Sequence, residues 1–167
     1  MATPVTKTSA TPTRGKAARG DASPAETATL SWLAVVRAYN LCDAVLASRL
    51  ATLGLRVPEH EVLVNLNRAP GLTQQQLAQR CFVAKSGVSM LVSRMEHDGL
   101  VRREADPVDG RIRRLSLTAR GTTLARRAQA LQDEVVRAMA EPVTAAELDM
   151  VRNVMERVGA RLQALLD

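Results

Sequence analysis

Residues 71–103 read GLTQQQLAQRCFVAKSGVSMLVSRMEHDGLVRR, and this stretch decides the fold. Thr73 followed three residues later by Gln76 is a capping box, which predicts the start of a short helix. A second helix is expected over residues 85–97, because apolar residues recur there on one helical face. Two short helices joined by a tight connection, here residues 82–84, are typical of a helix-turn-helix unit.

The residues that follow predict a β-hairpin. Gly99 permits the left-handed turn that ends the second helix. Two strand-like runs, 100–105 and 112–117, flank the turn-rich segment DPVDGR at 106–111. A hairpin directly after a helix-turn-helix is expected to form its wing.

Long helices are expected on both sides of this unit. Residues 30–52 lack Pro and Gly and are rich in Ala and Leu, and a shorter helix is expected over 58–68. Thr118 is expected to cap a helix that runs to about residue 140, and a last helix starts near Thr144. The fold class is therefore mainly α with a small β-hairpin wing. The last helix carries apolar residues at alternating steps of three and four, namely Leu148, Val151, Met155, Val158, Leu162 and Leu165. This heptad seam predicts an oligomer contact, with packing inside one subunit as the alternative.

Composition and charge narrow the class of partner. Aromatic residues make up only 2% of the chain, which argues against stacking on single-stranded nucleic acid. The net charge is +6, and residues 80–127 hold 11 Lys and Arg against 5 Asp and Glu, while the other segments cancel. A localised basic block is typical of a phosphate-binding surface, and an ordinary Arg-rich surface is the alternative.

The N-terminal residues 1–28 are dominated by Ala, Thr, Pro, Gly and Ser, and we expect a disordered basic tail there. We expect no run that is long and apolar enough to cross a membrane, and no secretory signal. The expected location is the cytoplasm.

The helix over residues 85–97 is expected to be the recognition helix, entering the major groove of double-stranded DNA by its N-terminal part. Hydroxyl, amide and cationic side chains there suit base edges and phosphates, and Gly87 allows close approach of the backbone. An arginine at the tip of the wing suits a narrow A·T-rich minor groove. Asp109 is expected to orient Arg111 through an ion pair. The candidate DNA-contacting residues are Thr73, Gln74, Gln75, Lys85, Ser86, Gly87, Ser89, Ser93, Arg94, Arg111 and Arg113.

Three ordered motifs resemble the MarR (multiple antibiotic resistance regulator) family of transcription factors. Residues 71–103 resemble its helix-turn-helix, DPVDGRIRRLSLT at 106–118 its wing, and LTARG at 117–121 the opening of the helix after the wing. The resemblance runs from about Leu30 to the C-terminus. It implies a MarR-type domain over 29–167, with dimerisation helices at 29–55 and 118–167 and the winged helix-turn-helix at 56–117. It also implies a homodimer on a pseudo-palindromic operator, with repression as the family default.

The resemblance also implies a small-molecule effector, because MarR-type proteins often bind small aromatic acids between their dimerisation helices and winged domain. His60 is expected on the same helical face as Leu63 and Asn67, and its imidazole titrates near neutrality. Trp32 or Tyr39 is expected to stack on the aromatic ring of the effector, and Arg37 is expected to bind its carboxylate. Asn40 completes the candidates. The hypothesis is an aromatic carboxylate of the hydroxybenzoate or hydroxynicotinate kind. A hydrogen-bonded core histidine and ordinary surface residues are the alternatives.

Other functions fit the sequence less well. A cysteine-based redox switch would use Cys42 or Cys81, but both are expected in apolar surroundings with no adjacent cation that clearly lowers the thiol pKa, so buried packing is favoured. An enzyme is not indicated, because there is no Gly-rich phosphate loop, no HExxH and no nucleophile elbow, and no cofactor or metal is expected. A non-specific architectural DNA-binding protein would share the basic block but would not need a wing and a dimer seam.

Overall fold

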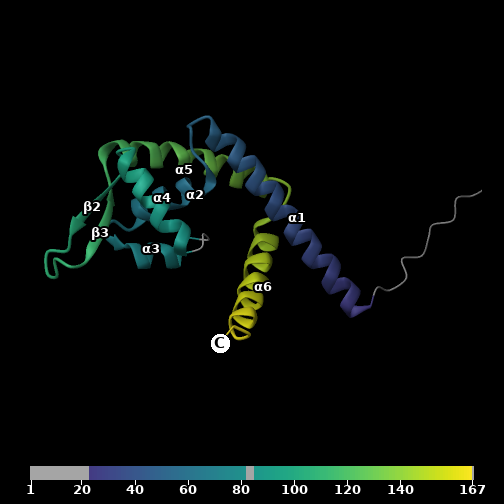
Figure 1. The fold of residues 1–167 in the computed structure, drawn as a ribbon. Coiled ribbons are helices and arrows are strands. Elements are labelled where there is room, and N and C mark those ends of the chain that lie inside the picture. The colour runs from purple at the N-terminus through teal and green to yellow at the C-terminus, as the bar shows by residue number, and fades with distance from the viewer. Residues whose placement is uncertain (1–22, 82–84, 167) are drawn as a thin grey trace, which may run out of the picture. The chain divides into compact units, whose positions relative to one another are not determined.

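The computed structural model describes residues 23–81 and 85–166, and the chain divides into two compact units, Met1–Arg37 and Ala38–Asp167. Their elements are shown in Figure 1. In chain order they are α1 (Pro24–Ala51), α2 (Val57–Arg68), β1 (Leu72–Thr73), α3 (Gln74–Arg80), α4 (Lys85–His97), β2 (Val101–Ala105), β3 (Arg113–Leu117), α5 (Ala119–Ala140) and α6 (Ala145–Gln163).

The described part of the N-terminal unit is the beginning of α1, which starts earlier than the sequence predicted. Ser23 accepts the main-chain N–H of Glu26 at 3.2 Å through its hydroxyl oxygen, and Pro24 stands at the first helical position. Both are favourable at a helix start. The expectation of a disordered tail over 1–28 is therefore wrong for residues 24–28, while residues 1–22 lie outside the described range.

Helix α1 also corrects the expectation about membrane-spanning runs. By length and composition alone, this 28-residue helix is apolar enough to cross a membrane. An Ala- and Leu-rich helix that packs in a soluble protein has the same composition. Several large apolar side chains of α1 are exposed in the single chain, including Leu30, Trp32, Leu33, Tyr39 and Leu41.

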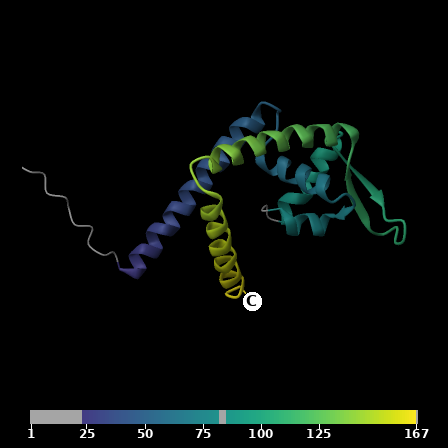
Figure 2. The ribbon, with the colours of Figure 1, turned by 180° about the vertical axis from the view of Figure 1, so that it is seen from behind.

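The core of the unit Ala38–Asp167 is aliphatic and gathers where α2, α3, α4 and the sheet meet. Its largest fully buried side chains are Leu50, Leu63, Leu66, Leu77, Met95, Leu115, Val62, Val88, Val92 and Val101. Ala125 and Ala128 of α5 join this core, and α5 packs against α2. Figure 2 shows α5, in green, running alongside these helices. The first half of α5 therefore packs against the core of the winged helix-turn-helix. Its small alanines allow this close approach.

A glycine allows α5 to begin where it does. A Cβ atom at Gly121 would lie 2.0 Å from the main-chain oxygen of Leu100, so no larger residue fits without a shift. The same oxygen accepts the main-chain N–H of Thr118 at 3.0 Å. The Thr118 hydroxyl accepts the N–H of Gly121 at 3.0 Å, which confirms the predicted cap. The LTARG motif thus combines a helix cap with a point of close approach.

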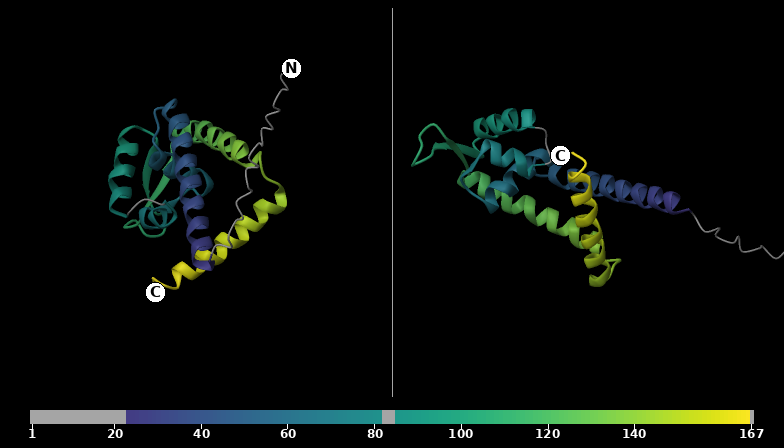
Figure 3. Two further views of the ribbon diagram at one scale, coloured as in Figure 1. Left: turned by 90° about the vertical axis from the view of Figure 1, so that its right-hand side faces the viewer. Right: turned by 90° about the horizontal axis from the view of Figure 1, so that it is seen from below.

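The sheet has three antiparallel strands in the order β1-β3-β2. The predicted hairpin is confirmed: β2 pairs with β3, and Val101 lies opposite Leu117. Figure 3 shows the loop of this hairpin extending beyond the neighbouring helices. The two-residue strand β1 was not predicted, since a segment that short has no periodicity of its own. It pairs Leu72 with Leu115 and so attaches the start of α3 to the wing.

Candidate DNA-binding surface and effector cavity

Helix α3 begins at the capping box that the sequence predicted. The Thr73 hydroxyl accepts the N–H of Gln76 at 3.2 Å, and the Gln76 side chain accepts the N–H of Thr73 at 2.9 Å. Gln74 and Gln75 follow in the first turn, where Gln74 is half-buried and Gln75 is exposed. The first turn of α3 therefore presents amide side chains at a fixed helix start.

Helix α4 has a buried face and an outward face, as predicted. Val88, Val92 and Met95 are buried, whereas Ser89 and Ser93 are exposed. Gly87 is half-buried on the same helix. The Ser93 hydroxyl accepts a hydrogen bond from Arg103 at 3.0 Å. The predicted connection at 82–84 lies outside the described residues, as do the side chains of Lys85 and Ser86.

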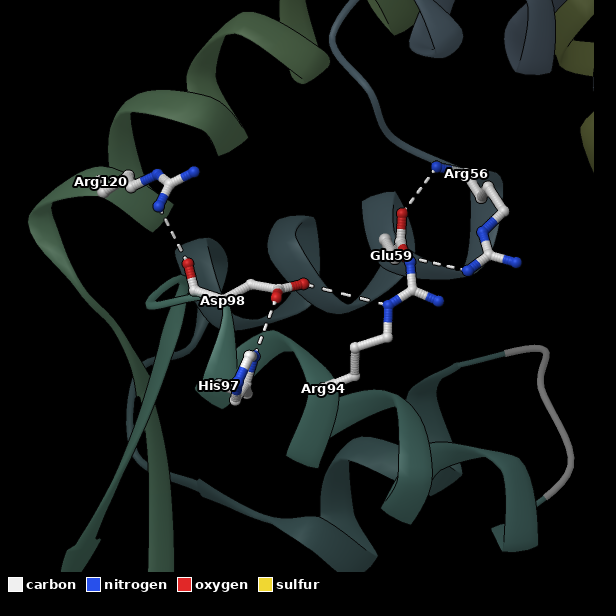
Figure 4. Close-up of polar contacts among 6 residues, drawn as sticks. All are labelled: Arg56, Glu59, Arg94, His97, Asp98 and Arg120. Atoms are coloured by element: carbon white, nitrogen blue, oxygen red, sulfur yellow. Dashed lines mark hydrogen bonds and ion pairs between the residues drawn. The ribbon is translucent and has the colours of Figure 1, made fainter.

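Arg94, a candidate DNA contact, takes part in a polar network within the protein (Figure 4). Its Nη2 atom lies 2.5 Å from Oε1 of the buried Glu59, and its Nε lies 3.9 Å from Oδ2 of Asp98. Glu59 also accepts the main-chain N–H of Arg56 at 2.9 Å. Arg120 of α5 donates to the main-chain oxygen of Asp98 at 3.1 Å. Arg94 therefore joins α4 to α2, which makes it a structural residue in the free protein.

A buried carboxylate organises the wing. Asp106 accepts the main-chain N–H groups of Val108 at 2.8 Å and Asp109 at 3.0 Å, and it also accepts a hydrogen bond from Nε of Arg114. Arg114 donates in addition to the main-chain oxygen of Gly71 at 2.9 Å. The N–H groups of Asp109 and Val108, followed by the Arg114 side chain, hold the pKa of Asp106 below its usual value. This tether ties the wing to the turn before α3.

The expected ion pair between Asp109 and Arg111 is not formed. The Asp109 carboxylate instead accepts the main-chain N–H of Arg111 at 3.0 Å, as is common for an aspartate two residues before an N–H group in a turn. Within the described residues, neither Arg111 nor Arg113 forms an ion pair, and both side chains are exposed on the wing. Their guanidinium groups face solvent.

A cavity of about 330 Å³ lies among α2, α5 and the part of α1 in the second unit. Two of the five predicted effector residues, Tyr39 and His60, line it. Asn40 is exposed and does not line it, and Trp32 and Arg37 are exposed residues of the N-terminal unit. The full lining is Tyr39, Cys42, Asp43, Leu46, Val57, His60, Glu61, Val64, Asn65, Arg68, Arg80 and Gln132.

The sequence placed His60 on one face of α2 together with Leu63 and Asn67. Leu63 is buried in the core and Asn67 is exposed, so neither lies with His60 in the cavity. The lining instead follows α2 in steps of four through Val64 to Arg68. Residues four apart stack one turn above another on one side of a helix.

His60 is 3% exposed, and its Nε2 atom lies 3.2 Å from Oε1 of Gln132. Its Nδ1 atom has no hydrogen-bond partner among the described residues. Burial lowers the pKa of His60; the bond to Gln132 opposes this shift and the charge of Arg68 adds to it. The imidazole is therefore neutral at pH 7, with one nitrogen free to accept a hydrogen bond.

Two cationic residues at this cavity were not predicted. Arg68 ends α2 and Arg80 ends α3, and both are exposed. Neither forms an ion pair within the described part of the chain, although Asp43 and Glu61 also line the cavity. The spacing of four residues from His60 through Val64 to Arg68 is a sequence signal that could have indicated Arg68, because residues four apart stack on one side of a helix.

Cys81 lies beside the same region and is 8% exposed. Burial, together with the charge of Glu61, raises the pKa of its thiol to about 11. A thiolate is the reactive form of cysteine, so Cys81 is poorly suited to sense an oxidant. Cys42 is half-buried and also lines the cavity.

Comparison with known proteins identifies the class. Residues 53–112 match the sequence model of the MarR family. The HTH-type transcriptional repressor Rv2887 of Mycobacterium tuberculosis is 31% identical over 114 residues, which cover 68% of this chain and 82% of that protein. The chain belongs to the MarR family. It is thus a DNA-binding transcriptional regulator, and its relatives are regulators rather than enzymes.

Solved structures of MarR-family proteins have the same fold. AbsC of Streptomyces coelicolor, a MarR family transcriptional regulator, superposes with a TM-score of 0.76 at 25% identity and covers 86% of this chain and 97% of its own. Rv2887 in complex with salicylic acid superposes with a TM-score of 0.62 at 28% identity, covering 83% of this chain and 98% of its own. The predicted fold class, mainly helical with a small sheet, is confirmed for this MarR-family chain.

Proposed function

We propose that this MarR-family regulator acts in the cytoplasm as a homodimeric repressor that binds a pseudo-palindromic operator and is released by a small aromatic carboxylate. The observation that carries the effector part is the cavity of about 330 Å³, which places a buried histidine near two arginines that have no ion-pair partner within the described residues. A cavity of this size suits a single aromatic ring with one or two polar substituents.

Recognition of operator DNA is assigned to α3, α4 and the wing. The outward face of α4 enters the major groove, and the first turn of α3 contacts the DNA backbone at its helix start. Arg111 and Arg113 lie on the wing with solvent-facing guanidinium groups, which suits insertion into a narrow minor groove. Arg94 is set aside from this surface, because Glu59 and Asp98 already hold it.

Dimerisation is assigned to α6 together with the outer parts of α1 and α5. The five seam residues within α6, and Leu165 just after its end, are between 40% and 65% exposed in the single chain. An apolar groove of about 380 Å³ also lies between α1 and α5, lined by Leu41, Val45, Val135, Ala138 and Met139 among others. Covering so much exposed apolar surface with a second copy is strongly favourable.

The effector is assigned to the hydroxybenzoate or hydroxynicotinate class. Nδ1 of the neutral His60 accepts a hydrogen bond from a ring hydroxyl, and Arg68 or Arg80 binds the carboxylate. Rv2887, which binds salicylic acid, is a relative that supports an aromatic acid of this type. Because Arg80 ends α3, a ligand bound by Arg80 displaces α3, the helix that precedes the recognition helix.

Calorimetry with salicylate and with 6-hydroxynicotinate tests the effector assignment. We expect Arg80→Ala and His60→Leu to weaken binding by about tenfold each, as is typical for loss of a charge-assisted or buried hydrogen bond. The matched control is Arg126→Ala, which removes an exposed arginine of α5 outside the cavity lining. Equal affinity in all four proteins would remove this cavity from the effector site.

A gel shift with the intergenic DNA upstream of the protein's own gene, in excess non-specific competitor, tests the DNA assignment. Arg111→Ala is expected to weaken specific binding, whereas the same change at Arg126 leaves it unchanged. Equal binding to every DNA would favour the architectural alternative, since phosphate contacts alone carry no sequence information. A redox switch is disfavoured by the raised pKa of Cys81, and loss of DNA binding after peroxide treatment would revive it.

A further inference from the structure

Helix α4 presents one large apolar side chain to solvent. Met90 is 78% exposed, although Val88 and Val92, each two residues away, are fully buried. Two helical positions correspond to a rotation of about 200°, so Met90 projects almost directly opposite the buried face. A single exposed apolar residue is unremarkable on most surfaces. Here it lies near the centre of the outward face of the proposed recognition helix.

The neighbours of Met90 limit what this face can recognise. Ser89 and Ser93 are exposed beside it, and the Ser93 hydroxyl already accepts a hydrogen bond from Arg103. Arg94 is held by Glu59 at 2.5 Å. The part of α4 with described side chains therefore offers hydroxyl groups and a thioether. It presents no unpaired Arg, Asn or Gln, the side chains that make two hydrogen bonds to a purine.

Thymine is the base whose major-groove edge carries an apolar group, the C5-methyl. Methionine is flexible and polarisable, so it adapts its shape to such a group. Resting on the DNA-binding role proposed above for α4, we propose that Met90 contacts the C5-methyl group of a thymine in each half-site and is a specificity-determining residue. The exposed wing arginines favour A·T pairs in the adjacent minor groove, so both parts of the surface select the same base composition.

Met90 also borders a hollow of about 270 Å³ between α4 and the start of α2, next to Pro58 and Leu91. A purely structural role would be to cover these residues. Such a role predicts a loss of stability and a uniform loss of DNA affinity on removal of the side chain. It predicts no dependence on a particular methyl group of the DNA.

Binding to modified DNA distinguishes a contact between Met90 and a thymine methyl group from a purely structural role of Met90. A short duplex is first selected by the wild-type protein from a random-sequence pool, and each thymine is then replaced by deoxyuridine. This replacement removes only the C5-methyl and leaves base pairing intact. Binding of wild type, Met90→Ala, Met90→Leu and Arg111→Ala to each duplex is measured by fluorescence anisotropy, and urea unfolding checks that each variant is folded.

We expect one symmetric thymine position at which deoxyuridine weakens wild-type binding about fourfold per half-site, the value for one buried methyl group. Met90→Ala loses this dependence, Met90→Leu retains most of it, and Arg111→Ala retains it at lower overall affinity. Specific binding by the wild type with no thymine position of this kind, or the same dependence in Met90→Ala, would overturn the inference and leave the proposed function standing. Failure of the wild type to select any sequence would overturn both.

Discussion

Nη2 of Arg94 lies 2.5 Å from Oε1 of Glu59 and thereby joins α4, the proposed recognition helix, to the first turn of α2. The Glu59 side chain is 6% exposed, whereas that of Arg94 is 51% exposed. The two partners are therefore not equivalent. Removal of the arginine leaves a negative charge inside the protein, whereas removal of the glutamate leaves a cation that water can solvate.

This asymmetry predicts that Arg94→Met lowers the free energy of unfolding by about 1–2 kcal/mol, less than for a fully buried pair because solvent reaches the arginine. Urea unfolding measures the difference. The control is Arg152→Met, which breaks an exposed pair with Asp149 and should cost about 0.5 kcal/mol or less. Equal losses in the two variants would show that Glu59 does not depend on Arg94.

Gly121→Ala is expected to destabilise the domain by about 3 kcal/mol, because its Cβ atom would overlap the main-chain oxygen of Leu100 and force α5 to shift. Thermal unfolding provides the measurement. Gly159→Ala is the matched change in α6, where nothing beyond the adjacent residues and the helix's own backbone lies within 4 Å of the new Cβ. It should leave stability unchanged or raise it by up to about 1 kcal/mol. A tolerated alanine at position 121 would contradict the close approach described here.

Stability should fall as pH is lowered from about 7 to 5, through His60. Its folded-state pKa is below the value of about 6.5 in the unfolded chain, so the unfolded chain takes up a proton first. The contribution is complete above pH 6.5 and is lost as pH falls from there toward the folded-state pKa. Comparison of unfolding free energies across this range should show a smaller slope for His60→Gln.

Asp106→Asn should loosen the wing without unfolding the domain. The neutral amide is a weaker acceptor for the N–H groups of Val108 and Asp109 and loses the charge that pairs with Arg114. Hydrogen exchange at these two amides should become faster, whereas Asp109→Asn should affect mainly the amide of Arg111. In the wild type the same loosening is expected in acid, as pH falls through the lowered pKa of Asp106.

Val158→Glu should convert the proposed dimer to monomers, because it places a charge in the apolar seam of α6. Met150→Glu is the control, since Met150 is 66% exposed on the same helix but lies off the seam. Sedimentation velocity distinguishes the two masses. A monomeric wild type, or a dimer that persists in Val158→Glu, would assign the exposed apolar residues another role.

Local signals in the sequence predicted most of the winged domain. The Thr73 capping box, Gly99 and the turn at 106–111 each determine backbone geometry within a few residues, and the structure confirms the elements that they delimit. The start of α1 was not predicted. Ser23 and Glu26 have capping-box spacing, but the Ala-, Thr-, Pro-, Gly- and Ser-rich composition of residues 1–28 indicated disorder.

The polar contacts were harder to predict. Glu59 and Arg94 are 35 residues apart, and Arg114 reaches Gly71 across 43 residues. No spacing rule connects such residues, because the partners meet only after the core has folded. The cavity has the same origin: Arg68 and Arg80 end different helices, and Gln132 approaches His60 from α5. The sequence indicated His60 and Tyr39 individually, but not the arginines beside them.

The tether of Asp106, Arg114 and Gly71 has a consequence for the operator. It ties the wing to the helix-turn-helix, so the protein itself would fix the distance between the proposed major-groove and minor-groove contacts. Each inserted base pair displaces one contact region from the other by about 3.4 Å along the DNA and about 35° around it. A regulator of this build tolerates base changes within a half-site better than changes in its length, so its operators should be recognisable by their spacing.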